Sequence, residues 1–296
     1  MKSKVYFTRA ITPEKVCEAY HRLGVTLPGR VAVKLHSGEQ GNQNYITPEF
    51  WKPMIDEIGG TVCETNTAYG DASGGVRDHT DSHLKLIDEH GWSKYFAFDL
   101  MDAEGEDHIW PIPGGKVLKE NHVPNHLTNY DSMLVLAHFK GHPMGGFGGA
   151  IKQLAIGCAS AKGKALIHSA GLTDDRFECW DKHASKTVFP EAMADAASSI
   201  YRHFEGRIAF VSVMKNLSVD CDCCAVAEDP CMADIGILSS LDPVALDQAC
   251  MDLVMASDDP GREHFMHRVN SRNGIHTIEA AAELGFGSRE YELIEF

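Results

Sequence analysis

Ser132-Met133-Leu134-Val135-Leu136-Ala137-His138-Phe139 is an apolar run with polar residues only near its two ends. A continuous apolar run of this length is typical of a strand that is buried on both faces. The glycine-rich stretch Gly145-Gly146-Phe147-Gly148-Gly149 comes shortly after it and leads into a helix predicted over Gly148–Ile156. The stretch therefore predicts a strand–loop–helix unit of an α/β protein.

The same order of strand and helix recurs along the chain. Thr12-Pro13 and Thr47-Pro48 each mark a helix start, with threonine as the cap and proline in the first turn. The other predicted strands are Val5–Thr8, Arg30–Leu35, Thr61–Glu64, Tyr95–Leu100, Arg207–Met214 and Tyr291–Glu295. The other predicted helices are 81–90, Pro190–Phe204, Asp242–Ala256, Gly261–Val269 and His276–Leu284. This alternation predicts a three-layer α/β/α fold with a mostly parallel sheet.

No linker, repeat or low-complexity segment interrupts the chain. We therefore expect residues 1–296 to form a single domain. The alternative is a sheet split into two α/β lobes that divide near residues 125–130.

The composition excludes two classes of partner. The net charge of −15 would repel nucleic acid and anionic membrane surfaces. The start of the chain turns polar at once, and no apolar run approaches the ~18 residues of a membrane helix. We therefore expect a cytoplasmic protein whose nine cysteines are reduced. Clustered cysteines in such a protein indicate metal binding or redox chemistry.

Polar side chains follow several of the predicted strands. In open parallel sheets, ligands bind beyond the carboxyl ends of the strands. We therefore expect these side chains to share one pocket, with catalytic roles for the lysines and histidines and a substrate-binding role for the asparagine. They are Lys34, His36, Asn66, His138, Lys140 and His142.

A cysteine cluster predicts a metal centre. Cys221, Cys223, Cys224 and Cys231 lie within one polar loop, and Cys158 is the strongest candidate for a ligand from elsewhere. Their spacing fits a structural zinc site poorly, whereas iron–sulfur clusters accept irregular spacing and a distant fourth ligand. The expected cofactor is a 4Fe-4S cluster, with zinc or nickel as the alternative.

The segment His138–Lys152 is the most distinctive part of the chain. Its glycines let backbone amides approach a ligand, and a following helix N-terminus favours an anion. It contains neither a Walker loop nor the dinucleotide-binding glycine pattern. We therefore expect Gly148 and Gly149 to bind an anionic substrate such as a carboxylate.

The sequence resembles the family known as domain of unknown function 362, often described as iron–sulfur proteins. The resemblance covers nearly the whole chain but implies no particular reaction. Many relatives carry extra C-x-x-C-x-x-C repeats after the Cys158 region, where this chain has only Cys179. The matching segments are Lys34–Glu39 with Gly41-Asn42, Thr65–Thr67, His138–Lys152, Gly157–Ser160 with Gly163-Lys164 and His168, Cys221–Cys223, Asp234–Leu238 with Asp242–Asp247, and Ser271–His276.

A more distant resemblance concerns His142 and Lys152, which flank Gly-Phe-Gly-Gly. This arrangement is similar to the nickel-pincer lactate racemase family, in which the lysine anchors the cofactor. The resemblance implies that Lys152 anchors or orients a cofactor or substrate, and that His142 is a general acid or base.

The sequence therefore predicts an iron–sulfur redox enzyme that acts on a small anionic substrate with an electron-transfer partner, in an anaerobic setting. Two alternatives stay open: a non-redox metalloenzyme of the racemase or lyase type acting on a hydroxy or keto acid, and a non-catalytic cluster-carrying protein. The substrate and the oligomeric state, a homo-oligomer included, are not determined by the sequence.

Overall fold

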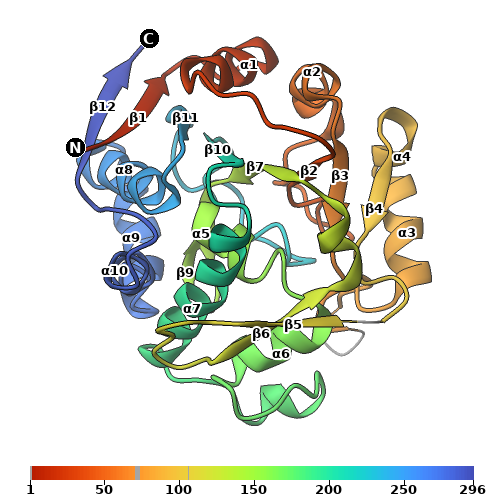
Figure 1. The fold of residues 1–296 in the computed structure, drawn as a ribbon. Helices are drawn as coiled ribbons and strands as arrows, with labels where there is room; N and C mark the ends of the chain where they lie inside the picture. Colours follow the sequence, from red (N-terminus) through yellow and green to blue (C-terminus); the bar gives the residue numbers. More distant parts are fainter. Residues whose placement is uncertain (1, 71–73, 106) are drawn as a thin grey trace.

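The computed structural model describes residues 2–70, 74–105 and 107–296. Within these residues an eight-stranded sheet forms the centre of the molecule, in the order β12-β1-β11-β10-β7-β2-β3-β4 (Figure 1). Its strands are β1 (Ser3–Thr8), β2 (Val31–Lys34), β3 (Thr61–Glu64), β4 (Phe98–Leu100), β7 (Ser132–His138), β10 (Ile208–Met214), β11 (Gly236–Ser240) and β12 (Tyr291–Glu295).

The sheet is mostly parallel, as the sequence predicts. β4, β3, β2, β7 and β10 all run in one direction. β11 is antiparallel to both of its neighbours, and β12 is parallel to β1 at the edge of the sheet. Because β2 pairs directly with β7, the sheet is continuous across the two halves of the chain. The division into lobes near residues 125–130 stays a prediction.

Helices cover both faces of the sheet and complete the predicted three layers. One face packs against α1 (Pro13–Arg22), α2 (Pro48–Ile58), α3 (Thr80–Glu89) and α4 (Trp92–Tyr95). The other face packs against α5 (Ala150–Ala155), α6 (Ala161–His168), α7 (Val188–His203), α8 (Pro243–Ala256), α9 (Arg262–Ser271) and α10 (His276–Glu283).

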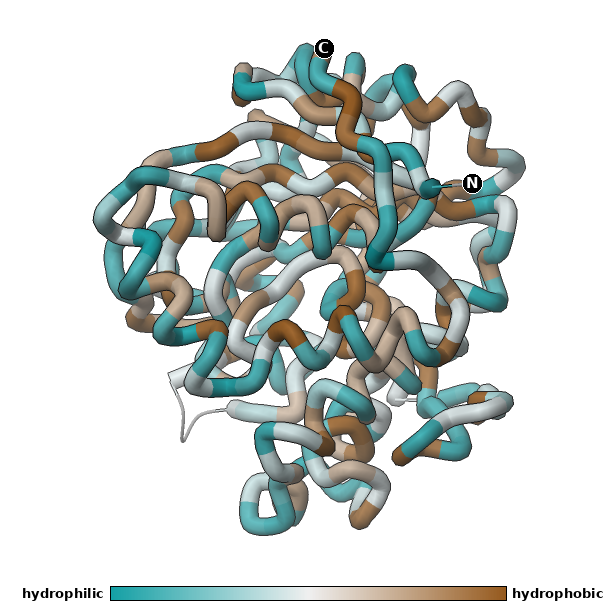
Figure 2. Tube along the Cα trace, turned by 90° about the vertical axis from the view of Figure 1, so that its left-hand side faces the viewer, coloured by the Kyte–Doolittle hydropathy of each residue, from teal (hydrophilic) through white to brown (hydrophobic). Residues whose placement is uncertain are grey.

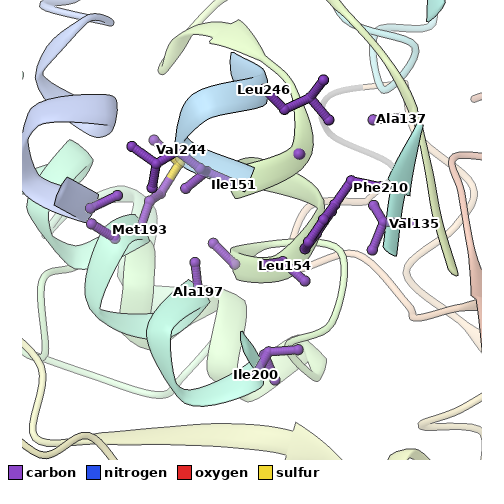
Figure 3. Close-up of a cluster of buried hydrophobic side chains, with 14 of the residues drawn as sticks. Val135, Ala137, Ile151, Leu154, Met193, Ala197, Ile200, Phe210, Val244 and Leu246 are labelled. Carbon is purple, nitrogen blue, oxygen red and sulfur yellow. The ribbon is translucent and has the colours of Figure 1, made fainter. Parts of the chain in front are cut away.

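The buried strands alternate their side chains between two hydrophobic cores. On β7, Leu134 and Leu136 face the core of α1 and α2, whereas Val135 and Ala137 face the core of α5, α7 and α8. Figure 3 shows this second core, where side chains of the three helices meet those of β7 and β10. Figure 2 shows hydrophobic positions along the segments in the middle of the molecule, with hydrophilic residues on the outer loops.

The predicted helix starts hold, with one difference in capping. Thr12 Oγ1 accepts a hydrogen bond from Lys15 N at 3.3 Å, and Asp242 caps α8 by accepting from Val244 N and Ala245 N. Thr47 makes no side-chain cap bond, although α2 begins at Pro48 as expected. No described helix is both long and apolar enough to cross a membrane.

Several elements differ from the sequence-based assignment. The predicted strand Tyr95–Leu100 is shorter and begins only at Phe98, because Tyr95 is the last residue of α4. The predicted helix from Gly148 begins at Ala150, because Gly148 pairs with Lys140 in a small hairpin. Elements that the sequence analysis did not assign are β5 (Asp107–Pro111), β6 (Glu120–Pro124), β8 (Lys140–His142), β9 (Gly146–Gly148), β11, α6, and the short helices η2 (Asn125–Asn129) and η3 (Glu178–Trp180).

Candidate functional site

A cavity of about 1080 Å³ lies beyond the carboxyl ends of β2, β3 and β7. Each of these strands delivers side chains to it from its end or from the loop that follows, as expected for an open parallel sheet. The sequence-predicted residues on its walls are Lys34, His36, Lys140, His142, Gly148, Gly149, Lys152, Cys223 and Cys224.

Two buried ion pairs form the wall beneath β2 and β3. Lys34 Nζ lies 2.7 Å from Glu64 Oε2, and Arg77 Nε lies 3.0 Å from Glu39 Oε2. Arg77 also reaches Glu64 Oε1 at 3.7 Å, so the two pairs form one network. Burial lowers the pKa of neighbouring His36 well below its usual value, and the Arg77 charge lowers it further. The His36 ring is therefore neutral at ordinary pH.

The hairpin of β8 and β9 forms the opposite wall. Gly141 N donates to Ser218 O at 2.8 Å, and a Cβ atom at Gly141 would lie only 2.2 Å from Val219 O. Only glycine therefore allows the hairpin to pack this closely on the loop that carries the cysteine cluster. The side chains of Lys140, on this hairpin, and of Lys152, on α5, lie alongside Gly148.

The segment Cys221-Asp222-Cys223 sends its side chains in two directions. Asp222 is almost fully buried, and its carboxylate accepts from Lys140 Nζ at 2.8 Å and from His138 Nδ1 at 2.9 Å. Cys221 and Cys223 instead approach Lys152 and His142. Asp222 thus anchors the loop while the two thiols stay together.

His142, Cys221 and Cys223 form a group that could hold a metal ion. Their candidate ligand atoms all lie within 4.8 Å of one another. His142 Nε2 is 3.8 Å from Cys223 Sγ, and Lys152 Nζ is 3.9 Å from Cys221 Sγ. A nearby ammonium group stabilises thiolates, which are the ligand form of cysteine.

The protonation of this group is set by its surroundings. His142 Nδ1 accepts from Met144 N at 3.2 Å and from Gly145 N at 2.8 Å, so the proton of the neutral ring resides on Nε2. Burial lowers the pKa of His142 well below its usual value, and the Lys152 charge adds to this. Burial also raises the pKa of the Cys221 thiol well above its usual value. Metal binding must therefore remove the thiol protons, and ligation by His142 Nε2 requires the ring proton to move to Nδ1 in place of the bonds from Met144 N and Gly145 N.

The structure does not place the remaining predicted thiols in this group. Cys224 is a near neighbour of this group. Its thiol forms a hydrogen bond with the Cys223 side chain, which lowers the pKa of Cys224. Cys231 Sγ donates to Leu217 O at 3.3 Å at the far end of the loop. Cys158 is fully buried in the hydrophobic core, where burial raises the pKa of its thiol to about 12.

Two other predicted residues support the site from outside the cavity wall. His138 Nδ1 bonds Asp222, and its Nε2 donates to Lys215 O at 2.6 Å. Asn66 bonds Thr80 and His83, and its neighbours Thr65 and Thr67 line the cavity in its place.

Sequence reasoning missed several charged residues of the site. Glu64 ends β3 and Asp222 lies between two cysteines, so both positions carried a signal that could have identified them. Arg77 follows no strand and gave no such signal, whereas Lys164 belongs to a segment that resembles the family. Burial lowers the pKa of Lys164 to about 8. Its Nζ donates to Thr65 Oγ1, Asn66 O and Ala159 O at 2.5, 2.6 and 2.8 Å.

The fold and site define an α/β protein with a cation-lined cavity and a Cys/His group beside it. The chain belongs to the family described as domain of unknown function DUF362, whose model matches residues 31–252. No curated protein matches the chain.

Two solved structures are similar to parts of the chain. The lactate racemase apoprotein from Thermoanaerobacterium thermosaccharolyticum is 13% identical with a TM-score of 0.44, over 70% of this chain and 50% of the other. A Thermotoga maritima protein is 12% identical with a TM-score of 0.40, over 92% of this chain and 59% of the other. The chain thus spans between half and three fifths of the length of these two proteins.

Proposed function

We propose that this protein is a metal-dependent enzyme that acts on a small anionic substrate. The observation that carries the proposal is the position of His142, Cys221 and Cys223 beside a cavity lined by Lys34, Lys140 and Lys152. A candidate metal group and several cations at one site would suit a reaction on a carboxylate-bearing substrate.

The charges of the wall favour an anion. Among the described residues, neither Lys152 nor Lys164 pairs with a carboxylate, although the chain as a whole is strongly acidic. The three N–H groups of Lys164 are all taken by oxygen acceptors, so Lys164 contributes charge alone. Lys140 uses one N–H on Asp222, which leaves Lys140 and Lys152 with donors for a ligand.

The donor set could hold a single ion. Ligand atoms of a tetrahedral zinc site lie roughly 3.5–3.8 Å apart, given metal–ligand bonds of about 2.0–2.3 Å. His142 Nε2 and Cys223 Sγ are 3.8 Å apart. A zinc or nickel ion held there would act as a Lewis acid toward a substrate oxygen. Lys140 and Lys152 would hold the substrate anion.

An iron–sulfur redox enzyme is the second candidate. One observation favours it: Cys224 adds a third thiol next to Cys223, and soft thiolates are the usual ligands of these clusters. In that case the same cavity would bind the substrate, and an electron-transfer partner would be needed.

Metal analysis and an optical spectrum after anaerobic purification test the proposal. We expect about one zinc or nickel ion per chain. Cys221→Ser and Cys223→Ser should lose it, whereas Cys17→Ser, which changes a solitary cysteine on α1, should retain it. About four iron atoms with a brown colour that dithionite bleaches would favour the second candidate instead.

The anion site is tested by calorimetric titration with a panel of 2-hydroxy and 2-oxo acids. Binding of at least one acid is expected, and Lys152→Met should weaken it by about tenfold or more. Absence of both metal and anion binding in the wild-type protein would overturn the proposal.

A further inference from the structure

Four consecutive backbone carbonyls of the cysteine loop accept hydrogen bonds from Glu39, Asn42 and Tyr69. Asn42 Nδ2 donates to Cys221 O at 3.2 Å and to Cys224 O at 2.8 Å. The carbonyls between these two are also paired: Glu39 N donates to Asp222 O and Tyr69 Oη to Cys223 O, each at 2.8 Å. The backbone of the loop is therefore fixed along its whole turn.

These bonds determine which atoms of the loop face the metal group. Carbonyl oxygens that already accept hydrogen bonds are poor competitors for an ion. The Asp222 carboxylate is also engaged, by Lys140 and His138. The thiols of Cys221 and Cys223 are left facing His142.

Asn42 occupies the central place in this arrangement, and its amide is fixed at both ends. Its Oδ1 accepts from Asn44 N at 2.9 Å and from Tyr45 N at 3.1 Å, so Nδ2 must point toward the loop. The side chain is 5% exposed and does not line the cavity. Neighbouring Gly41 has a φ of +82°, and a Cβ atom there would lie 3.0 Å from Ala225 O. The segment thus packs directly on the cysteine loop.

We propose that Asn42 is the positioning residue of the metal group: its two Nδ2 hydrogen bonds clamp the turn from Cys221 to Cys224 and hold the thiols at ligand distance. This inference rests on the proposed function, because it assumes that the group binds an ion. Asn42 touches neither metal nor substrate. Hydrogen bonds that orient metal ligands in this way commonly change metal affinity by about 10- to 100-fold.

Cobalt binding tests the inference, because Co²⁺ substitutes for zinc and its absorption spectrum reports thiolate ligation and geometry. Asn42→Ala should weaken Co²⁺ binding by about 10- to 100-fold and alter the ligand-field bands. The matched control is Gln43→Ala, because Gln43 Nε2 donates to Ala227 O at 2.9 Å, outside the cysteine turn. Gln43→Ala should bind Co²⁺ as the wild type does.

Asn42→Asp distinguishes the role of the Nδ2 donor in positioning the cysteine turn from the role of the side chain in the structure of its own segment. It keeps the Oδ1 acceptor for Asn44 N and Tyr45 N but replaces the donor, so it should bind Co²⁺ as weakly as Asn42→Ala or more weakly. Tyr69→Phe, which removes the bond to Cys223 O together with the contacts of Tyr69 Oη with Glu39 and Arg77, gives a second test in a separate segment if the Asn42 variants fail to fold. A smaller loss of affinity is expected for it.

The outcomes distinguish the two proposals. Equal Co²⁺ affinity and identical spectra in wild type, Asn42→Ala and Tyr69→Phe would overturn the positioning role alone. Full recovery by Asn42→Asp would do the same, because this variant lacks the donor. A wild-type protein that binds no Co²⁺ would overturn the positioning role and the proposed function together.

Discussion

Lys140 Nζ lies 2.8 Å from Asp222 Oδ2, and both side chains are almost fully buried. This pair joins the β8–β9 hairpin to the loop that carries the candidate ligands. Because His138 Nδ1 bonds the same carboxylate, Asp222 is the point where strand β7, its hairpin and the cysteine loop meet.

Asp222→Asn should destabilise the protein by about 3–5 kcal/mol, because it leaves the Lys140 ammonium buried without its counter-charge. Urea unfolding followed by circular dichroism measures this. The double variant Lys140→Met/Asp222→Asn should be less destabilised than Asp222→Asn alone. If the midpoint of urea unfolding is the same for Asp222→Asn as for the wild type, the ion pair has no structural role.

Gly149→Ala should cost about 1–3 kcal/mol of stability, a typical value for overpacking. A Cβ atom at Gly149 would lie 2.3 Å from Asp247 Oδ1, a carboxylate that accepts from Ala150 N and Ile151 N. Gly148→Ala is the matched control, because its Cβ atom would make ordinary contacts at 3.4 Å or more. The melting temperatures of the two variants check this, and equal values would contradict it.

The pH dependence of stability should contain a contribution from Asp247. Burial raises the pKa of this carboxyl from 3.8 to about 7, against the opposing effect of two backbone N–H donors. Between these two pH values the folded state binds more protons than the unfolded state, so this contribution to stability falls as the pH rises. Above about pH 7 the loss is complete.

Asp247→Asn removes that titration. The free energy of unfolding of the wild type, relative to that of the variant, should therefore be larger at pH 5 than at pH 8. Free energies of unfolding of both proteins at the two pH values measure the difference. A difference that stays constant with pH would show that Asp247 does not titrate in this range.

Lys34→Met should be strongly destabilising, by about 3 kcal/mol or more, because it removes the closest partner of the buried Glu64. Lys52→Met is the control, since Lys52 and Asp56 form an exposed pair on α2. The exposed pair should contribute roughly 0–1 kcal/mol. Equal effects of the two changes on thermal unfolding would argue against a structural role of Lys34, which the sequence analysis regarded as catalytic.

The fold was largely predictable because its signals are local. The apolar run Ser132–His138 and the Thr-Pro helix starts act within a few residues, and each element formed as expected. The strands β8 and β9 gave no such signal, because both are short and rich in glycine. Their hairpin is stabilised by contact with residues 218 and 219, far away in the sequence.

The site was predictable only where its residues follow strands or carry sulfur. Lys34, His36, Lys140 and His142 follow strands and line one cavity. Asn42 lies in a polar stretch that resembles a solvated loop, yet it is buried because it bonds Cys224, 182 positions away. A single sequence contains no record of that pairing.

The reversed direction of β11 has a consequence for how this architecture can diversify. Because β10 and β11 are antiparallel neighbours, the connection over residues 215–235 leaves and re-enters the sheet at the same rim. It needs no helix to carry the chain back across a face. Residues can be inserted, deleted or exchanged over this connection while every crossover stays intact, so the two cysteines of the candidate metal group can vary without a change in strand order.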